Sequence, residues 1–330
     1  MLRAHDTGCC PFQRAHGTGP ENRQRVPERM DSVINKAIVA LLPLIPRSLV
    51  WKVSRRYIAG KTLDDALRCV EKLNEAGMSA TLDVLGEDTT DHSEALAGEK
   101  IYQESLREIS SRGLDANISV KLSMLGLKFD VPLCESIVMR LLQSAELYDN
   151  YVRMDMEDSS VTGITLDLYR KLRSQSDRIG AVVQSYLRST ESSVSDLLSG
   201  GVTNLRLCKG IYVEPEEIAF KEFEEVQDSF RATLRLLLEN GAQRVGIATH
   251  DPQLVLSTLE LLKELEIPKE RYEFQMLLGV AEKMRGDLVA AGHPLRVYVP
   301  FGEEWYAYST RRLRENPQIA GHVVKNLFRG

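Results

Sequence analysis

Short apolar runs rich in β-branched residues alternate with longer amphipathic stretches along most of this chain. Eight of these runs end in polar residues and are followed by a segment with helical periodicity: Ser79–Glu87, Ala116–Ser123, Tyr151–Asp158, Ile179–Tyr186, Asn204–Ile211, Arg244–Asp251, Arg271–Leu277 and Leu295–Gly302. Strands that alternate with helices predict a parallel sheet with the helices outside it. Eight such units favour closure into a barrel, so we predict an α/β fold of the (βα)8, or TIM-barrel, type.

The stretches between the runs carry the start and stop signals of helices. The first has an N-cap signal at Thr62 and ends at Gly77, where a glycine is expected after the helix C-terminus. The longest helix is predicted after the fifth run, with Pro215 in its first turn and its end at Asn240, and Pro252 is expected to open the next. Other helices are predicted over residues 91–112, 132–148, 162–175 and 190–200.

The segment after the eighth run differs from the other predicted helices. It places aromatic, basic and acidic side chains on one short helix: Trp305, Tyr306, Tyr308, Arg311, Arg312 and Glu315. It lacks the aliphatic stripe of an outer barrel helix, so we predict that it lies over the barrel mouth. Because neighbouring helix residues point about 100° apart, Arg311 and Arg312 reach one small carboxylate together only if the helix crosses above it. Glu315 can hold both in place.

The N-terminal part falls into two segments. Residues 1–29 have a disordered composition and lack the apolar region of a signal peptide, so we predict a disordered tail or residues that precede a true start at Met30. Residues 30–330 are then the barrel domain with an N-terminal helical arm. Residues 33–53 are the most hydrophobic stretch, and two prolines and several basic residues interrupt it. We expect one or two amphipathic helices that dock on the barrel, with a membrane surface as the alternative.

Composition narrows the class of protein. A chain of 330 residues, with 43% hydrophobic and 27% charged residues, fits one large globular enzyme domain. The net charge of −5 offers no basic stripe, which argues against nucleic acid as a partner. Five cysteines without metal-ligand spacing indicate a reduced chain without a disulfide framework. We expect a cytoplasmic protein, and peripheral contact with the inner face of the cytoplasmic membrane stays open.

In a (βα)8 barrel the chemistry sits at the C-terminal ends of the strands. The polar residues that close the runs are therefore the first candidates: Asp83, Glu87, Lys121, Ser123, Asp155, Glu157, Gln184, Arg206, Lys209, Thr249, His250, Gln275 and Tyr298. Lys121 sits in an apolar strand and must be paired or neutral, and Asp155 is its predicted partner. This pair could close the barrel or clamp a substrate, and a Lys121 with a depressed pKa could form a Schiff base.

Arg206 and Lys209 add positive charge to the same mouth, which suits a phosphate-bearing cofactor, and Gly210 permits close backbone approach. His250 has no second ligand at metal spacing, so we favour cofactor contact over a metal site, with a structural histidine as the alternative. There is no GxGxxG or GxxxxGK[ST] motif, which disfavours a Rossmann domain or a P-loop. A Schiff-base aldolase using Lys121 or Lys209 and a non-catalytic binding module are the rival functions.

Ten short segments follow one another in order around all eight units: Arg56–Gly60 (RYIAG), Asp83–Glu87 (DVLGE), Ser119–Ser123 (SVKLS), Asp155–Asp158 (DMED), Val183–Tyr186 (VQSY), Arg206–Tyr212 (RLCKGIY), Ala248–His250 (ATH), Phe274–Leu277 (FQML), Arg296–Pro300 (RVYVP) and Arg311–Leu313 (RRL). In this order the chain resembles the proline dehydrogenase family, flavoenzymes that open proline catabolism. The match covers roughly residues 31–330. Each segment alone is weak, but the ordered set is highly specific.

The resemblance implies a distorted (βα)8 barrel with FAD at the strand C-termini and the last helix over the barrel. It implies that Arg311 and Arg312, helped by Lys121, bind the substrate carboxylate. Asp155 and Arg206 are implied to be the catalytic polar pair, with Arg206 near the flavin N5. The implied FAD contacts are Met156, Gln184, Arg206, Lys209, Gly210, Ile211, Thr249, His250, Gln275 and Glu315. The implied walls around the substrate ring are Leu207, Tyr212, Tyr298 and Tyr308.

The implied reaction is oxidation of L-proline to Δ1-pyrroline-5-carboxylate by hydride transfer to the flavin, with electrons passed to a quinone. This is the first step of proline catabolism to glutamate. The chain resembles the monofunctional form, which leaves its product to a separate pyrroline-5-carboxylate dehydrogenase. Two residues depart from the family pattern: Ile211 replaces the usual alanine, and Asp251 replaces the usual asparagine. Asp251 puts a negative charge near a cofactor that is itself anionic.

Overall fold

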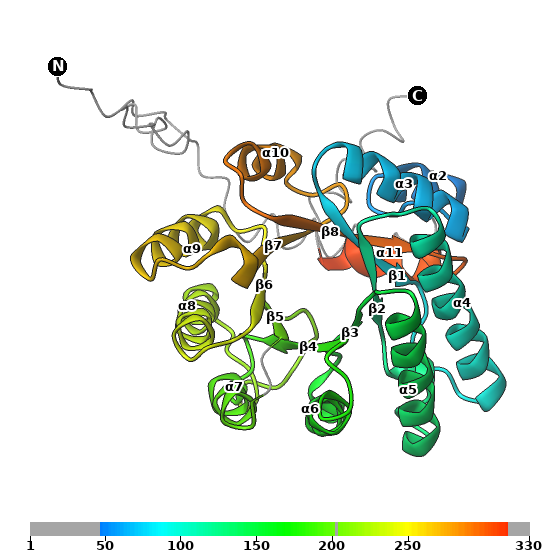
Figure 1. Ribbon diagram of the computed structural model, residues 1–330, viewed down its shortest axis with the longest axis horizontal. Coiled ribbons are helices and arrows are strands. Elements are labelled where there is room, and N and C mark those ends of the chain that lie inside the picture. Colours follow the sequence, from blue (N-terminus) through cyan, green and yellow to red (C-terminus); the bar gives the residue numbers. More distant parts are fainter. Residues whose placement is uncertain (1–46, 202–203, 316–330) are drawn as a thin grey trace.

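The computed structural model describes residues 47–201 and 204–315. Within them, eight parallel strands close into a barrel in sequence order (Figure 1). The strands are β1 Ser79–Val84, β2 Ala116–Val120, β3 Val152–Met154, β4 Ile179–Gln184, β5 Asn204–Cys208, β6 Arg244–Ala248, β7 Tyr272–Leu277 and β8 Leu295–Phe301. β8 pairs back with β1 over the full length of β1, from Ser79 opposite Arg296 to Val84 opposite Phe301. The predicted (βα)8 barrel is confirmed.

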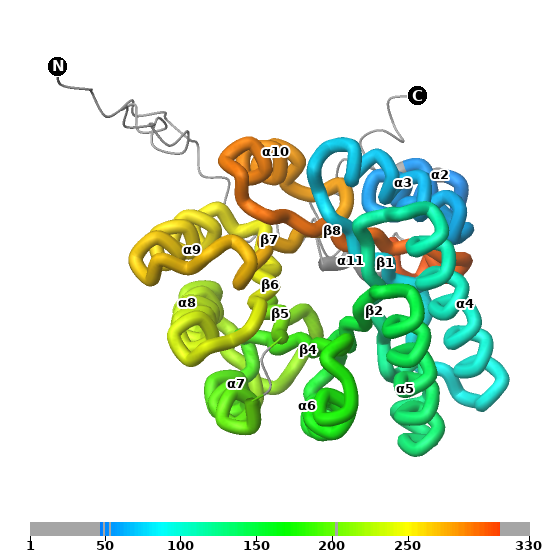
Figure 2. Tube along the Cα trace, viewed as in Figure 1, coloured from blue at the N-terminus to red at the C-terminus, as the bar shows by residue number. Residues whose placement is uncertain are grey.

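Helices surround the barrel, and most of them form an outer ring (Figure 2). They are α2 Arg47–Ser54, α3 Leu63–Glu75, α4 His92–Ser111, α5 Val131–Leu147, α6 Ser159–Arg173, α7 Thr190–Ser199, α8 Phe223–Glu239, α9 Pro252–Glu264, α10 Glu282–Ala290 and α11 Trp305–Glu315, with the 3-10 turns η3 Ser123–Leu125 and η4 Lys269–Arg271. Side chains cap several of these helices as the sequence indicates. Thr62 forms a reciprocal capping box with Asp65, and Asp91 accepts two backbone N–H bonds at the start of α4.

The predicted start of the helix after β5 is wrong. α8 begins at Phe223 and has 17 residues, so the 20-residue α4 is longer. Pro215 instead lies in the loop that precedes α8, where its carbonyl accepts the N–H groups of Ile218 and Ala219. The N–H of Phe220 donates to Tyr186 after β4 at 2.8 Å. These contacts with the neighbouring loop hold the segment in an irregular path that local helical propensity does not indicate.

The two faces of the sheet have different character. Side chains that point outward, such as Leu82, Ile118 and Ile247, form one hydrophobic core with the inner faces of the helices, where Tyr169 and Phe230 are fully buried. Side chains that point into the barrel include buried charged and amide groups: Asp83, Arg153, Arg206, Glu273 and Gln275. Burial of such groups is costly unless each is paired, so the barrel interior must be a connected polar network.

The first and last described helices pack against each other. The rings of Trp51 on α2 and Trp305 on α11 lie edge to face with centroids 4.7 Å apart, and the Arg47 guanidinium stacks on Tyr306 at 4.6 Å. The described part of the hydrophobic N-terminal stretch is therefore docked on the protein, as the favoured alternative predicted. The predicted tail over residues 1–29 lies outside the described residues. Among the described helices, none has both the length and the apolar character needed to cross a bilayer.

Candidate active site

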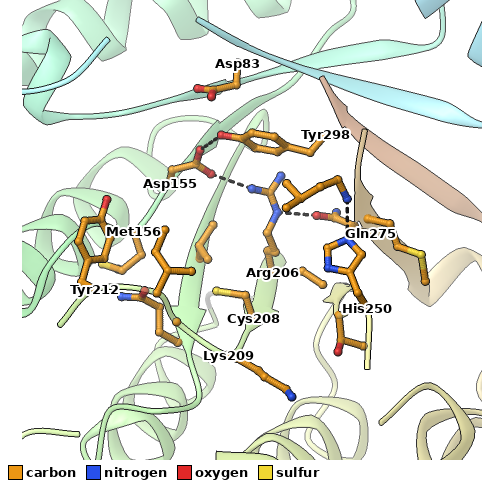
Figure 3. A pocket seen from close by; sticks show the side chains of 18 of the residues that line it. Asp83, Asp155, Met156, Arg206, Cys208, Lys209, Tyr212, His250, Gln275 and Tyr298 are labelled. Atoms are coloured by element: carbon orange, nitrogen blue, oxygen red, sulfur yellow. Dashed lines mark hydrogen bonds and ion pairs between the residues drawn. The ribbon is translucent and has the colours of Figure 1, made fainter. Parts of the chain in front are cut away.

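A cavity of about 610 Å³ lies at the C-terminal ends of the strands, a size typical of small-molecule sites (Figure 3). Most of the predicted site residues line it: Lys121, Asp155, Met156, Gln184, Arg206, Lys209, Gly210, Ile211, Tyr212, Thr249, His250, Gln275, Tyr298 and Tyr308. The barrel brings them together because successive parallel strands end at the same edge. Tyr308 reaches the cavity from α11, so the first turns of this helix lie at the barrel mouth as predicted.

A cluster of polar side chains around Asp155 forms the floor of the cavity (Figure 3). Asp155 accepts a hydrogen bond from Arg206 at 2.7 Å and from the Tyr298 hydroxyl at 2.6 Å. Ser119 donates to the same carboxylate at 2.6 Å. Burial, and then the negative charges of Asp155 and Asp83, raise the pKa of Tyr298 well above its usual value. Tyr298 therefore stays a phenol that donates to Asp155, and the cluster has a defined geometry.

The predicted partner of Lys121 is wrong. Its ammonium forms an ion pair with Asp83 on β1, a carboxylate that is only 1% exposed. Asp155 directly follows β3, on the other side of β2, and its oxygens accept hydrogen bonds from Arg206, Ser119 and Tyr298. Burial opposes the charge of Lys121, but Asp83 and Asp155 outweigh it and raise the pKa of the ammonium. Lys121 is thus a charged group at the cavity wall, which disfavours a Schiff-base role because that chemistry needs a neutral amine.

Asp251 is the counterion of Lys209. The two groups are 2.6 Å apart, and Gln227 donates to the same carboxylate oxygen at 2.7 Å. The other oxygen accepts the N–H of Gln253 and caps α9. Burial opposes the Asp251 charge, but the contacts with Lys209 and Gln227 lower its pKa. The ammonium of Lys209 also lies 4.2 Å from the centroid of the Phe223 ring. The positive charge at this side of the mouth is therefore partly neutralised.

His250 is held by a backbone contact. The N–H of Leu277 on β7 donates to its Nε2 at 2.8 Å, so Nε2 is an acceptor and the neutral ring carries its proton on Nδ1. Across residues 47–201 and 204–315, no three His, Cys, Asp or Glu side chains gather as ligands for a metal ion. The ring lines the cavity, which is the position that contact with a cofactor requires.

Gly210 occupies a position that only glycine fits. Its φ is +104°, and a Cβ placed on it would lie 2.2 Å from the ring of Tyr186. The N–H of Tyr186 donates to the carbonyl of Lys209 at 2.9 Å, and this bond holds the backbone at Lys209 and Gly210 against the Tyr186 ring. Glycine therefore lets Lys209 and Ile211 flank the cavity on a closely packed loop.

Some predicted residues take other positions. Leu207 does not line the cavity, because side chains alternate along β5 and it points into the core with no exposed surface. Its neighbour Cys208 lines the cavity instead, and sequence reasoning did not select it. The side chains of Arg311, Arg312 and Glu315 lie outside the described part of α11. Their predicted contacts therefore stay predictions.

Other lining residues are not among the site residues that the resemblance implies, and Glu157, Phe223 and Met276 are examples. Glu157 was a candidate as a strand-end carboxylate, and it accepts the N–H of Ser123 at 2.9 Å. Burial raises its pKa even though Ser123 donates to it. Phe223 and Met276 also line the cavity. Alternation along β7 places Met276 on the face opposite to Gln275, so the strand pattern gives no signal for it, and Phe223 depends on the path of the loop before α8.

Comparisons with known proteins agree with this fold and site. Residues 66–325 match the sequence profile of the proline dehydrogenase family. The chain belongs to this family. Proline dehydrogenase 1 of Bacillus subtilis strain 168 is 34% identical over 279 residues, which are 84% of this chain and 91% of that protein. Proline dehydrogenase 2 of the same strain is 35% identical over 274 residues, which are 82% of this chain and 89% of that protein. As a member of the proline dehydrogenase family, the chain is an oxidoreductase.

A solved structure supports the same fold. Proline utilization A (PutA) from Bdellovibrio bacteriovorus, inactivated by N-propargylglycine, superposes with a TM-score of 0.76 at 24% sequence identity. The match covers 87% of this chain and 37% of that larger protein. At this identity the likeness concerns the barrel architecture.

Proposed function

We propose that this proline dehydrogenase family member oxidises L-proline to Δ1-pyrroline-5-carboxylate with FAD bound in the cavity. The observation that carries the proposal is the cluster in which Arg206 and Tyr298 both donate to Asp155 at the cavity floor. Lys121 adds a charged ammonium to the wall. A cationic group beside a fixed polar cluster suits a small zwitterion that carries one carboxylate.

The residues present fit FAD. Lys209 supplies a cation for phosphate, and the glycine-dependent loop at Gly210 brings backbone close to the cavity. Gln184, Thr249 and His250 add polar groups at successive strand ends. The apolar lining residues that could face a planar ring are Met156, Val182, Ile211 and Met276. A mixed lining of this kind, largely apolar with a few placed polar groups, is typical of cofactor sites.

When bound, FAD would accept the hydride that leaves the ring carbon next to the proline nitrogen, and the nitrogen would release a proton to solvent as the C=N bond forms. The residues of the chain bind and orient the substrate. Lys121 attracts its carboxylate, and Arg311 and Arg312 are the further carboxylate ligands that the resemblance implies. Asp155 fixes Arg206 and Tyr298, so that the substrate ring meets a rigid surface and reacts from one orientation. Tyr212 and Tyr308 line the same space.

The aldolase alternative is not favoured, because both candidate lysines are ion-paired in this structure. Lys121 pairs with Asp83, and Lys209 pairs with Asp251. Transfer of the electrons to a quinone and use of the product by a separate pyrroline-5-carboxylate dehydrogenase stay predictions from the family resemblance. Cytoplasmic location with peripheral membrane contact also stays a prediction.

The proposed function is tested by the visible spectrum of the purified protein. We expect a yellow protein with non-covalently bound FAD, released on denaturation and bleached without oxygen by L-proline. D-proline and glycine are the matched controls, because each keeps the amine and carboxylate but not the geometry of L-proline. A folded protein that neither carries FAD nor takes it up would contradict the proposal, as would flavin that L-proline leaves oxidised.

A second prediction concerns the counterion of Lys209. Replacing Asp251 by asparagine should tighten FAD binding about two- to fivefold, because a partly exposed ion pair is worth up to about 1 kcal/mol and its loss frees Lys209. Asparagine still caps α9. The dissociation constant is measured by quenching of flavin fluorescence at several salt concentrations, and the gain should shrink as salt rises. Asp228→Asn, on the exposed face of α8, is the control. Weaker binding by Asp251→Asn would show that Asp251 itself holds the cofactor.

A further inference from the structure

Three buried side chains form a line across the barrel interior that ends at the cavity. Glu273 and Gln275 lie on β7, and Arg206 lies on β5. Each is at most 6% exposed. The Nε–H of Arg206 donates to Gln275 Oε1 (Figure 3), and Gln275 Nε2 donates to Glu273 Oε1 at 2.5 Å. The amide of Gln275 therefore links a buried carboxylate to the arginine that contacts Asp155.

The chemistry at the two ends gives this amide one orientation. A guanidinium only donates hydrogen bonds, so Arg206 requires the carbonyl oxygen of Gln275. A carboxylate only accepts them, so Glu273 requires the NH2 group. If the amide turned over, its NH2 group would face the N–H donor of Arg206 and its oxygen would face the carboxylate of Glu273. Both hydrogen bonds would then be lost.

Two arginine side chains hold the carboxylate of Glu273 in place. Arg296 Nε donates to one carboxylate oxygen at 2.9 Å, and Arg244 donates to the other at 2.8 Å. Arg296 also donates to the carbonyl of Ala80 at 2.6 Å and to the side chain of Asn117 at 3.1 Å, which ties it to β1 and β2. These arginines outweigh the effect of burial and lower the pKa of Glu273 to about 2. The carboxylate is therefore charged and fixed at neutral pH.

A glycine on the strand between them makes the link possible. Gly246 on β6 lies opposite Arg206 on one side and Glu273 on the other. A Cβ at this position would lie 2.6 Å from the Nε2 of Gln275. Because Gly246 has no side chain, the Gln275 side chain can pass over the inner face of β6 and reach Arg206 on β5.

We propose that Glu273 is a positioning residue, which fixes the amide of Gln275 and through it the guanidinium of Arg206 against Asp155. The inference deepens the proposed function and rests on it where turnover is concerned. The positioning of Arg206 by Glu273, however, can be tested without any substrate. Arg206 lies 5.4 Å from the Tyr298 ring, and Tyr298 donates to Asp155. The environment of Tyr298 therefore reports where Arg206 sits.

The first measurement uses the full-length protein as purified, labelled with 13C at the tyrosine Cζ. The signal of Tyr298 is assigned by its loss in Tyr298→Phe. We expect Glu273→Gln and Gln275→Leu to shift this signal in the same direction as Arg206→Lys. The matched control is Glu99→Gln, which removes another buried, arginine-paired carboxylate outside the barrel, where Arg140 contacts Glu99 at 2.6 Å. That variant should leave the Tyr298 signal in place.

The second measurement is turnover of L-proline by the same variants. We expect kcat to fall about 10- to 100-fold in Glu273→Gln and Gln275→Leu, by analogy with the loss of an outer partner that orients a functional group. Because Glu273 acts through Arg206, adding Glu273→Gln to Arg206→Lys should cost less than the single change does. Melting temperatures of all variants, including Glu99→Gln, separate loss of stability from loss of positioning.

The two measurements distinguish two kinds of failure. A Tyr298 signal that Glu273→Gln leaves unmoved, in protein that stays folded, would overturn the positioning role whatever the substrate is. A shifted signal in a protein that never oxidises L-proline would keep the positioning role and reject the proposed function. Additive effects of Glu273→Gln and Arg206→Lys on kcat would also overturn the inference, because they would mean that Glu273 acts by another route.

Discussion

Arg206→Met should lower kcat/KM for L-proline by about 30- to 5,000-fold, which corresponds to the 2–5 kcal/mol lost when one partner of a buried charge pair is truncated. Arg206 is 6% exposed and donates to Asp155 and to Gln275. Methionine fills a similar volume but leaves Asp155 with one fewer donor and Gln275 with an unpaired carbonyl. The measurement is steady-state oxidation of L-proline, corrected for the fraction of enzyme that carries FAD.

Arg206→Lys separates charge from geometry. Lysine keeps the positive charge, but a single ammonium cannot reach both Asp155 and Gln275 as the planar fork of arginine does. We therefore expect Arg206→Lys to recover only a small part of the kcat/KM that Arg206→Met loses. Arg235→Met removes an exposed arginine that pairs with Glu239 and Glu264, and it should keep parent activity. If Arg206→Met turned over L-proline within threefold of the parent, the proposed site would be misplaced.

Local patterns were sufficient to predict the barrel. All eight strands begin within one residue of the predicted start, because each is a short β-branched run after a turn signal. Seven of the eight strands end earlier than the predicted runs, because residues at their ends leave the ladder, whereas β7 ends at Leu277 as predicted. The start of α8 was not predictable in this way. The loop before it is fixed by Tyr186 and Leu187 in the neighbouring loop, which no local signal encodes.

The membership of the site was more predictable than its pairings. Strand-end position selects most cavity residues, because every strand of the barrel ends at the same edge. Lys121, however, has a carboxylate on each neighbouring strand, and sequence cannot say which one it contacts. Lys121 pairs with Asp83, and the oxygens of Asp155 accept hydrogen bonds from Ser119, Arg206 and Tyr298 instead. The link from Glu273 to Arg206 was hidden for the same reason, because it depends on the register that places Gly246 between them.

Gly210→Ala should raise the FAD dissociation constant by about 30-fold or more. A positive φ costs a residue with a Cβ about 1–2 kcal/mol, and overpacking costs about 1–3 kcal/mol. At Gly210 both costs apply, since φ is +104° and the new Cβ would lie 2.2 Å from the Tyr186 ring. The loop that carries Lys209 and Ile211 would relax to another path. FAD would then bind only the minor fraction in the original conformation, which lowers the apparent affinity by that fraction.

Two other glycines isolate the contributions to this effect. Gly241 has a φ of +79° with nothing within 4 Å of its Cβ position, so Gly241→Ala carries the backbone cost alone. Gly163 lies within α6 with equally open surroundings, and Gly163→Ala should raise stability by about 0.5–1 kcal/mol. Both should bind FAD like the parent, as measured by flavin fluorescence. If Gly210→Ala also did so, the loop at Lys209 would not need its present path to hold the cofactor, because the clash with Tyr186 would have been absorbed without cost to binding.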